Sequence, residues 1–275
     1  MDVRKRVAEF TRCSAYDRAS LGWSDPADTP RTTSRLVEEL HALLDAAGIP
    51  PPFVLVGHSF GGLLVRAFAA QYPDQVVGLV LVDPLCSGEW LQASDVKSRM
   101  LRRGVVLSRR GAVLARLGIV RLSLRLLSGG ARRLPQLIAK VSSGRGESTI
   151  SRIVGEVRKM PEETWPAIQV HWCQPKSFLG MASYLESLPE SCAEAAALSL
   201  PGSVPVTILS ADNATPVERA EREAIARSSS EGKHVVASSS GHWIHLDHPE
   251  LVVQAIREMV ELARSGGRGA NRRES

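Results

Sequence analysis

The chain has few of the residues that build disulfide frameworks, cysteine metal clusters or membrane spans. It contains only four cysteines among 275 residues, and none forms a C-x-x-C pair. Their wide spacing excludes a disulfide scaffold and a cysteine zinc site. No run reaches about 18 uncharged apolar residues, so no membrane-spanning helix is expected. The charged start, M-D-V-R-K-R, lacks the apolar core of a secretory signal, and a cytoplasmic protein is expected.

Acidic residues are absent from one long segment. Residues 97–145 contain thirteen Lys or Arg and no Asp or Glu, so the rest of the chain is net negative although the total is +5. Residues 104–127 alternate Leu and Val with Arg at helical spacing. Three interpretations stay open: a solvated helical face, a helix covering a pocket, or a weak contact with an anionic membrane surface. No nucleic-acid-binding motif accompanies this charge, so no nucleic-acid partner is expected.

Short apolar runs separated by helical stripes predict a mostly parallel α/β sheet. The helical stripes cover about 33–47 and 249–263. The runs expected to form strands are T-R-C-S-A-Y at 11–16, F-V-L-V at 53–56, V-V-G-L-V-L-V-D at 76–83, V-P-V-T-I-L at 204–209 and K-H-V-V-A at 233–237.

The segment between Pro84 and Gly202 contains no clear strand. It is too long for a loop, which predicts an inserted helical cap. The expected division is a core of residues 1–84 and 203–264, a helical cap of residues 85–202, and a disordered tail of residues 265–275.

The stretch V-L-V-G-H-S-F-G-G at 54–62 contains a Gly-x-Ser-x-Gly motif between a predicted strand and a predicted helix. A sharp turn there forces the serine backbone into a strained region, and neighbours without a Cβ avoid clashes. The turn exposes the hydroxyl and directs helix N-terminal amides toward it. Ser59 is therefore a candidate nucleophile.

A serine hydroxyl needs a base, and His242 is the best placed of seven histidines. It follows the last predicted strand and precedes the last predicted helix. With His245 and His248 it could also form a metal-binding H-x-x-H-x-x-H set. Pro249 restricts that backbone and no second ligand cluster exists, so neither a metal nor an organic cofactor is expected.

These motifs, with A-Y-D-R-A-S-L-G-W-S-D before them and G-L-V-L-V-D-P and S-G-H-W-I-H-L-D-H-P-E-L-V after them, resemble the α/β-hydrolase superfamily. Within it the chain is similar to bacterial esterase-like serine hydrolases with a helical cap. The resemblance implies Ser59 as nucleophile, His242 as base and the Phe60 backbone N–H as an oxyanion donor. It also implies hydrolysis of a small carboxylic ester or related acyl bond through an acyl-serine intermediate.

The acid of the triad has two candidates under this resemblance. Asp212, in I-L-S-A-D-N-A-T-P, follows the strand that precedes the histidine strand, and Asp83 ends the strand after the nucleophile helix. The interpretation leans slightly toward Asp212. Either carboxylate would accept the imidazole N–H, fix its tautomer and stabilise the imidazolium.

One expected part of the superfamily pattern is missing upstream. Members normally carry a strand ending in an H-G-type loop, whose N–H is the second oxyanion donor. No H-G or G-G dipeptide precedes T-R-C-S-A-Y here, so an N-terminally shortened core is expected. Losing one oxyanion donor typically costs about 10²–10³ in turnover. The alternative function is therefore an impaired or non-catalytic α/β-hydrolase-fold binding protein, or a truncated gene product.

Overall fold

The structure is a computed structural model that describes residues 3–128, 160 and 162–270. The chain divides into two compact units. The sheet unit comprises residues 1–15, 32–92 and 189–275, and the helical unit comprises residues 16–31 and 93–188. Among the helices that the structure describes, none is both long enough and apolar enough to cross a membrane.

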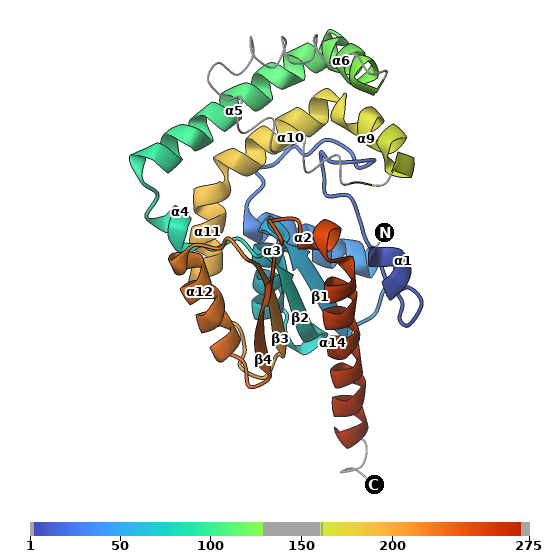
Figure 1. The fold of residues 1–275 in the computed structure, drawn as a ribbon, viewed down its shortest axis with the longest axis vertical. Helices are drawn as coiled ribbons and strands as arrows, with labels where there is room; N and C mark the ends of the chain where they lie inside the picture. The colour runs from blue at the N-terminus through green and yellow to red at the C-terminus, as the bar shows by residue number, and fades with distance from the viewer. Residues whose placement is uncertain (1–2, 129–159, 161, 271–275) are drawn as a thin grey trace. The chain divides into compact units, whose positions relative to one another are not determined.

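The sheet unit is built on four parallel strands in the order β1-β2-β3-β4 (Figure 1). Four of the five predicted strands are confirmed, and each is hydrogen-bonded to the next strand along the chain, with one register shift between Phe53 and Val54 of β1. Their bounds are Phe53–His58 for β1, Val76–Val82 for β2, Val206–Ala211 for β3 and Gly232–Ala237 for β4.

The fifth predicted strand, T-R-C-S-A-Y at 11–16, is wrong: residues 12–17 have no regular structure. The segment has little apolar surface to bury, and Tyr16 is exposed. Only Cys13 packs against the core of the sheet unit. Among the described strands, β1 therefore has one neighbour, β2.

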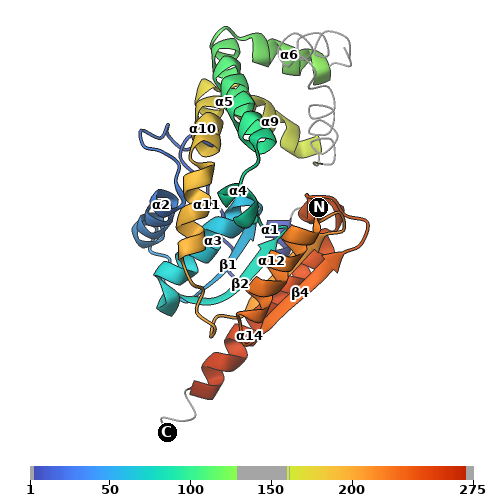
Figure 2. The same ribbon diagram turned by 90° about the vertical axis from the view of Figure 1, so that its left-hand side faces the viewer.

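Helices cover both faces of the sheet. Leu79 and Val80 of β2 are both fully buried although successive side chains point to opposite faces. The face of the sheet that carries Val80 packs against α14. Helix α3, which begins directly after Ser59, also contacts β1 and β2 (Figure 2). The helices of this unit are α1 Val3–Val7, α2 Thr33–Ala46, α3 Phe60–Gln71, α4 Gly88–Leu91, α11 Leu188–Ala197, α12 Pro216–Arg227, α13 Ile244–Asp247 and α14 Pro249–Ala270, with the 3-10 turn η1 at Pro73–Gln75.

The helical unit contains two long helices that pack along each other, α5 at Asp95–Arg116 and α10 at Pro175–Glu186. Between them in sequence lie α6 Ile119–Ser128, the 3-10 turn η2 Glu162–Thr164 and α9 Trp165–Trp172. Ser94 caps α5 by accepting a hydrogen bond from the Lys97 amide.

The unit boundaries differ from the expected division at 84 and 202. Residues 16–31, expected in the core, belong to the helical unit, whereas α4 and most of α11 belong to the sheet unit. Part of the expected tail, residues 265–270, continues α14, and residues 271–275 lie outside the described part. The sequence predicted an inserted helical segment but not the residues at which it begins and ends, because helices lie on both sides of each boundary.

Candidate active site

Ser59 occupies a sharp turn between β1 and α3. Its backbone has φ 54° and ψ −122°, a conformation that residues other than glycine rarely adopt. The turn is fixed to the end of β2, since the Ser59 N–H donates to Val82 O at 3.1 Å and the Leu85 N–H donates to Ser59 O at 3.0 Å. Ser59 is half-buried, and backbone strain at a residue held between two fixed elements is typical of a functional position.

Two glycines around Ser59 are required by space. A Cβ on Gly57 would overlap the backbone carbonyl of Gly61. A Cβ on Gly62 would come within 2.7 Å of the Pro84 Cβ. The close approach of α3 to β1 and to the end of β2 therefore explains Gly57 of the motif and Gly62 just after it, whereas a Cβ on Gly61, the second glycine of the motif, would meet nothing within 4 Å.

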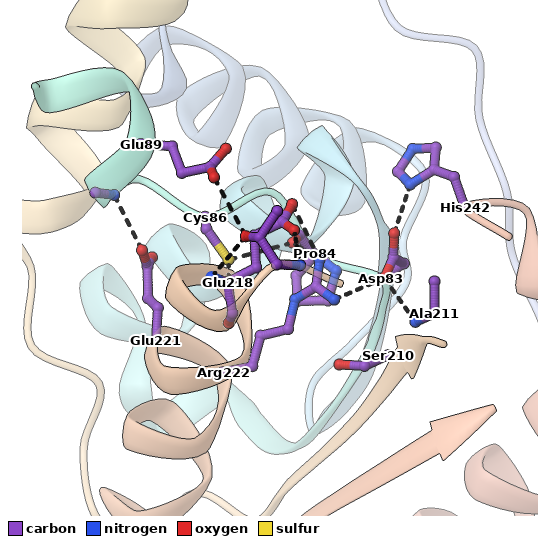
Figure 3. A network of polar contacts seen from close by, with 12 residues as sticks. Asp83, Pro84, Cys86, Glu89, Ser210, Ala211, Glu218, Glu221, Arg222 and His242 are labelled. Carbon is purple, nitrogen blue, oxygen red and sulfur yellow. Dashed lines mark hydrogen bonds and ion pairs between the residues drawn. The ribbon is translucent and has the colours of Figure 1, made fainter. Parts of the chain in front are cut away.

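His242 lies between β4 and α13 and contacts the end of β2. Its Nδ1 is 2.6 Å from Asp83 Oδ2 (Figure 3). The Asp83 side chain is 8% exposed, whereas that of His242 is 47% exposed. A carboxylate can only accept, so Nδ1 carries the proton and Nε2 of the neutral ring is left with a lone pair.

Asp83 is held by three donors from three different segments. Besides His242, its Oδ1 accepts from the Ala211 N–H at 2.8 Å and from Arg222 Nη1 at 2.7 Å (Figure 3). Burial alone raises the pKa of Asp83, but the hydrogen bonds from His242 and Ala211 and the charge of Arg222 together keep that pKa below its ordinary value. Asp83 is therefore a carboxylate at neutral pH.

Arg222 of α12 is the residue of this network that the sequence interpretation missed. Its side chain is 3% exposed, and its Nη2 donates to Pro84 O at 3.0 Å. A signal was present, because Arg222 shares the inward stripe of α12 with the buried residues Ile225 and Ala226 at i+3 and i+4. An arginine at an apolar position of a helix predicts a buried anion that faces it.

Asp212 lies away from this network. It is exposed, its Oδ2 accepts from the Ser239 N–H at 3.3 Å, and its own N–H donates to Ser240 O. In the described part of the chain no hydrogen bond joins it to His242. The slight preference for Asp212 over Asp83 is not supported by this geometry, because the imidazole of His242 reaches Asp83 at the end of β2, whereas only the backbone of the same loop contacts Asp212.

Two further histidines surround His242. His58 Nε2 donates to the backbone O of His242 at 2.8 Å, and its ring centroid is 4.5 Å from that of His242. Burial, with the nearby charges of His242 and His245, lowers the pKa of His58 to about 4. His58 is therefore neutral at physiological pH, and its N–H holds the His242 backbone. Burial also lowers the pKa of His245.

Ser59 is connected through the backbone to the residues that surround its candidate base, His242. Ser59 follows His58 and is bonded to Val82, the residue before Asp83. No hydrogen bond joins the Ser59 hydroxyl to His242 within the described residues, which is common before a substrate binds. Phe60, whose N–H is the expected oxyanion donor, is the first residue of α3.

Comparison with known proteins agrees with this architecture. A sequence model described as "Alpha/beta hydrolase family" matches residues 2–255. The chain belongs to this family.

Relatives of this α/β hydrolase differ in how much they share with it. An "AB hydrolase superfamily protein" of Gibberella zeae is 24% identical over 95% of the chain and 82% of its own length. The protein YqjL of Bacillus subtilis is 39% identical over 30% of the chain, a match that spans 31% of YqjL. The lipase LipV of Mycobacterium tuberculosis is 43% identical over 28% of the chain and 29% of its own length.

Solved structures share the fold of this α/β hydrolase at low sequence identity. A haloalkane dehalogenase variant from Bradyrhizobium elkanii has a TM-score of 0.63 at 18% identity, covering 96% of this chain and 85% of its own. A mutant described as a putative epoxide hydrolase from Pseudomonas aeruginosa has a TM-score of 0.62 at 14% identity, covering 90% and 78%. These likenesses agree with a hydrolase fold and do not define the bond that is broken.

Proposed function

We propose that the protein hydrolyses a carboxylic ester or a related acyl bond through an acyl-serine intermediate. The observation that carries the proposal is the residue at the strained turn, which is serine. A serine oxygen that attacks an alkyl halide or an epoxide would form an ether, and water does not cleave ethers under mild conditions. Attack on an acyl carbon forms an ester, which water can cleave, so the enzyme is regenerated.

The reaction divides the roles among Ser59, His242 and Asp83. Ser59 Oγ bonds to the acyl carbon while its proton passes to His242 Nε2, and the departing alcohol then takes that proton as its C–O bond breaks. In the second half, water adds to the acyl carbon and gives a proton to His242. The acid leaves and Ser59 regains its hydrogen. The Phe60 N–H is proposed to bind the oxyanion in both halves.

The Asp83–His242 hydrogen bond at 2.6 Å supports this assignment of the base. It keeps the proton on Nδ1, so that Nε2 is free to accept one from Ser59. The low pKa of Asp83 keeps the carboxylate charged while the imidazolium forms. A serine nucleophile needs both effects in its base.

A serine-directed fluorophosphonate probe tests the proposal, with Ser59→Ala as the critical variant and Ser230→Ala, on the surface, as its matched control. We expect the wild type and Ser230→Ala to be labelled, and Ser59→Ala to lose both labelling and about 10⁴-fold or more of the hydrolysis of a p-nitrophenyl ester. Release of bromide from 1-bromobutane or opening of styrene oxide, with no ester turnover, would contradict the acyl assignment. A folded wild type that is never labelled would favour the non-catalytic alternative.

A further inference from the structure

The outer face of α5 is the surface that the proposed chemistry leaves unexplained. This helix packs on α10 through small residues. A Cβ on Gly104 would approach Leu185 within 2.9 Å, one on Gly111 would run into Phe178, and Ala112 is buried. Because small residues fill the contact between α5 and α10, the larger aliphatic side chains of α5 are left to face elsewhere.

Five residues of α5 and its C-cap residue Leu117 form one stripe at the 4-3-4-3-4 spacing of a single helix face, roughly opposite the small residues. Val106, Val113 and Leu117 are 47%, 56% and 68% exposed, and the three arginines are exposed as well. We call this stripe the α5 outer face; its residues are Arg99, Arg103, Val106, Arg110, Val113 and Leu117.

The charge of the α5 outer face has one sign. Asp95, at the N-terminus, is the only acidic residue of α5, and none follows before Glu147 in the sequence. Arg109, beside the stripe, pairs with Glu186 of α10 at 2.6 Å. The chain outside residues 97–145 is net negative, so the basic charge is concentrated in that segment, which includes most of α5, rather than spread over the protein.

We propose that the α5 outer face lies on the surface of an anionic phospholipid bilayer, with the helix in the plane of the interface. A purely solvated face does not need three aliphatic side chains exposed among its arginines. A nucleic-acid surface would use aromatic stacking or polar base contacts, and α5 has no aromatic residue. Arginines that contact headgroups beside aliphatic side chains that enter the acyl boundary match an interfacial helix.

Vesicle sedimentation tests this surface, independently of Ser59 and of any hydrolysis. The probes are vesicles of phosphatidylcholine alone and vesicles with about 30% phosphatidylserine. We expect binding only to the anionic vesicles. Arg103→Glu with Arg110→Glu should reduce the partition coefficient by about tenfold or more, since it reverses charge in the stripe. Arg219→Glu with Arg227→Glu, on exposed positions of α12, makes the same charge change and should have little effect.

A second variant separates insertion from simple attraction of charges. Val113→Ser with Leu117→Ser leaves the charge unchanged and should still weaken binding to anionic vesicles severalfold. Equal binding to neutral vesicles, equal losses in the α12 control, or no loss in the serine variant would each overturn the proposal. Stronger binding to a short RNA or DNA duplex than to anionic vesicles would assign the face to nucleic acid instead. Circular dichroism verifies that each variant is folded.

Discussion

Asp83 and Asp212 occupy equivalent positions in the fold, but they differ in burial and in their hydrogen-bond partners. Each follows the carboxyl end of a parallel strand, β2 for Asp83 and β3 for Asp212. Asp83 is buried and held by Arg222, Ala211 and His242, whereas Asp212 is exposed and accepts one long hydrogen bond from Ser239. The end of a parallel strand therefore offers a position for a carboxylate. The side chains that contact this carboxylate from other segments distinguish Asp83 from Asp212 as a partner for His242.

The largest expected difference between the two carboxylates is in catalysis. Asp83→Asn should lower kcat/KM for a p-nitrophenyl ester by about 10⁴, because the amide can favour the wrong imidazole tautomer and no longer stabilises the imidazolium. Asp212→Asn should change it by less than about twofold, since an exposed side chain with one weak contact contributes little.

Steady-state kinetics on both variants, with circular dichroism to verify folding, makes the comparison. A larger loss from Asp212→Asn than from Asp83→Asn would reverse the assignment of the acid.

Arg222 provides a smaller test that separates charge from position. Arg222→Met leaves Asp83 buried without its cation and should cost about 3–5 kcal/mol of unfolding free energy. It should also shift the acidic limb of the kcat/KM profile to higher pH, since the pKa of Asp83 rises when the charge of Arg222 is removed. Arg222→Lys keeps the charge and should leave that limb in place while stability falls.

Urea denaturation and a pH–rate profile measure the two effects of the Arg222 variants. Arg219→Met, one turn earlier on an exposed position of α12, is the matched control. An acidic limb that stays unchanged in Arg222→Met would remove Arg222 from the electrostatics of the site and leave it a packing role.

The smallest expected effect is the acid dependence of stability that Asp83 contributes. Its pKa in the folded protein lies below the ordinary value of 3.8. The folded state thus binds a proton less readily than the unfolded chain, so this stability is full above about pH 3.8 and is lost as pH falls through the folded pKa. The difference in unfolding free energy between wild type and Asp83→Asn should shrink from pH 5 to pH 3. A constant difference would show that Asp83 is not held as a charged group.

The sequence predicted the parts of the molecule that depend on local pattern. Strands such as 53–56 and 76–83 were found because buried parallel strands are continuous apolar runs. The turn at Ser59 was found because the Gly-x-Ser-x-Gly motif lies directly after such a run. The choice between Asp83 and Asp212 depends on which carboxylate the His242 side chain reaches, which is a tertiary property. Arg222 was missed because no helix was expected over residues 216–227, so its place on the inward stripe with Ile225 and Ala226 was not considered. The strand expected at 11–16 lacked the apolar surface that would hold it in a sheet.

Most of the helical unit lies between β2 and β3 in the sequence, and this chain order determines when the parts of the site are synthesised. These strands are hydrogen-bonded neighbours, with Leu79 opposite Val206, yet residues 83–205 separate them in the chain. At the pace of translation this segment takes on the order of ten seconds to make. Ala211, Arg222 and His242, the three partners of Asp83, all follow it. During that interval Asp83 lacks all three of these partners, and the site is completed by the last quarter of the nascent chain.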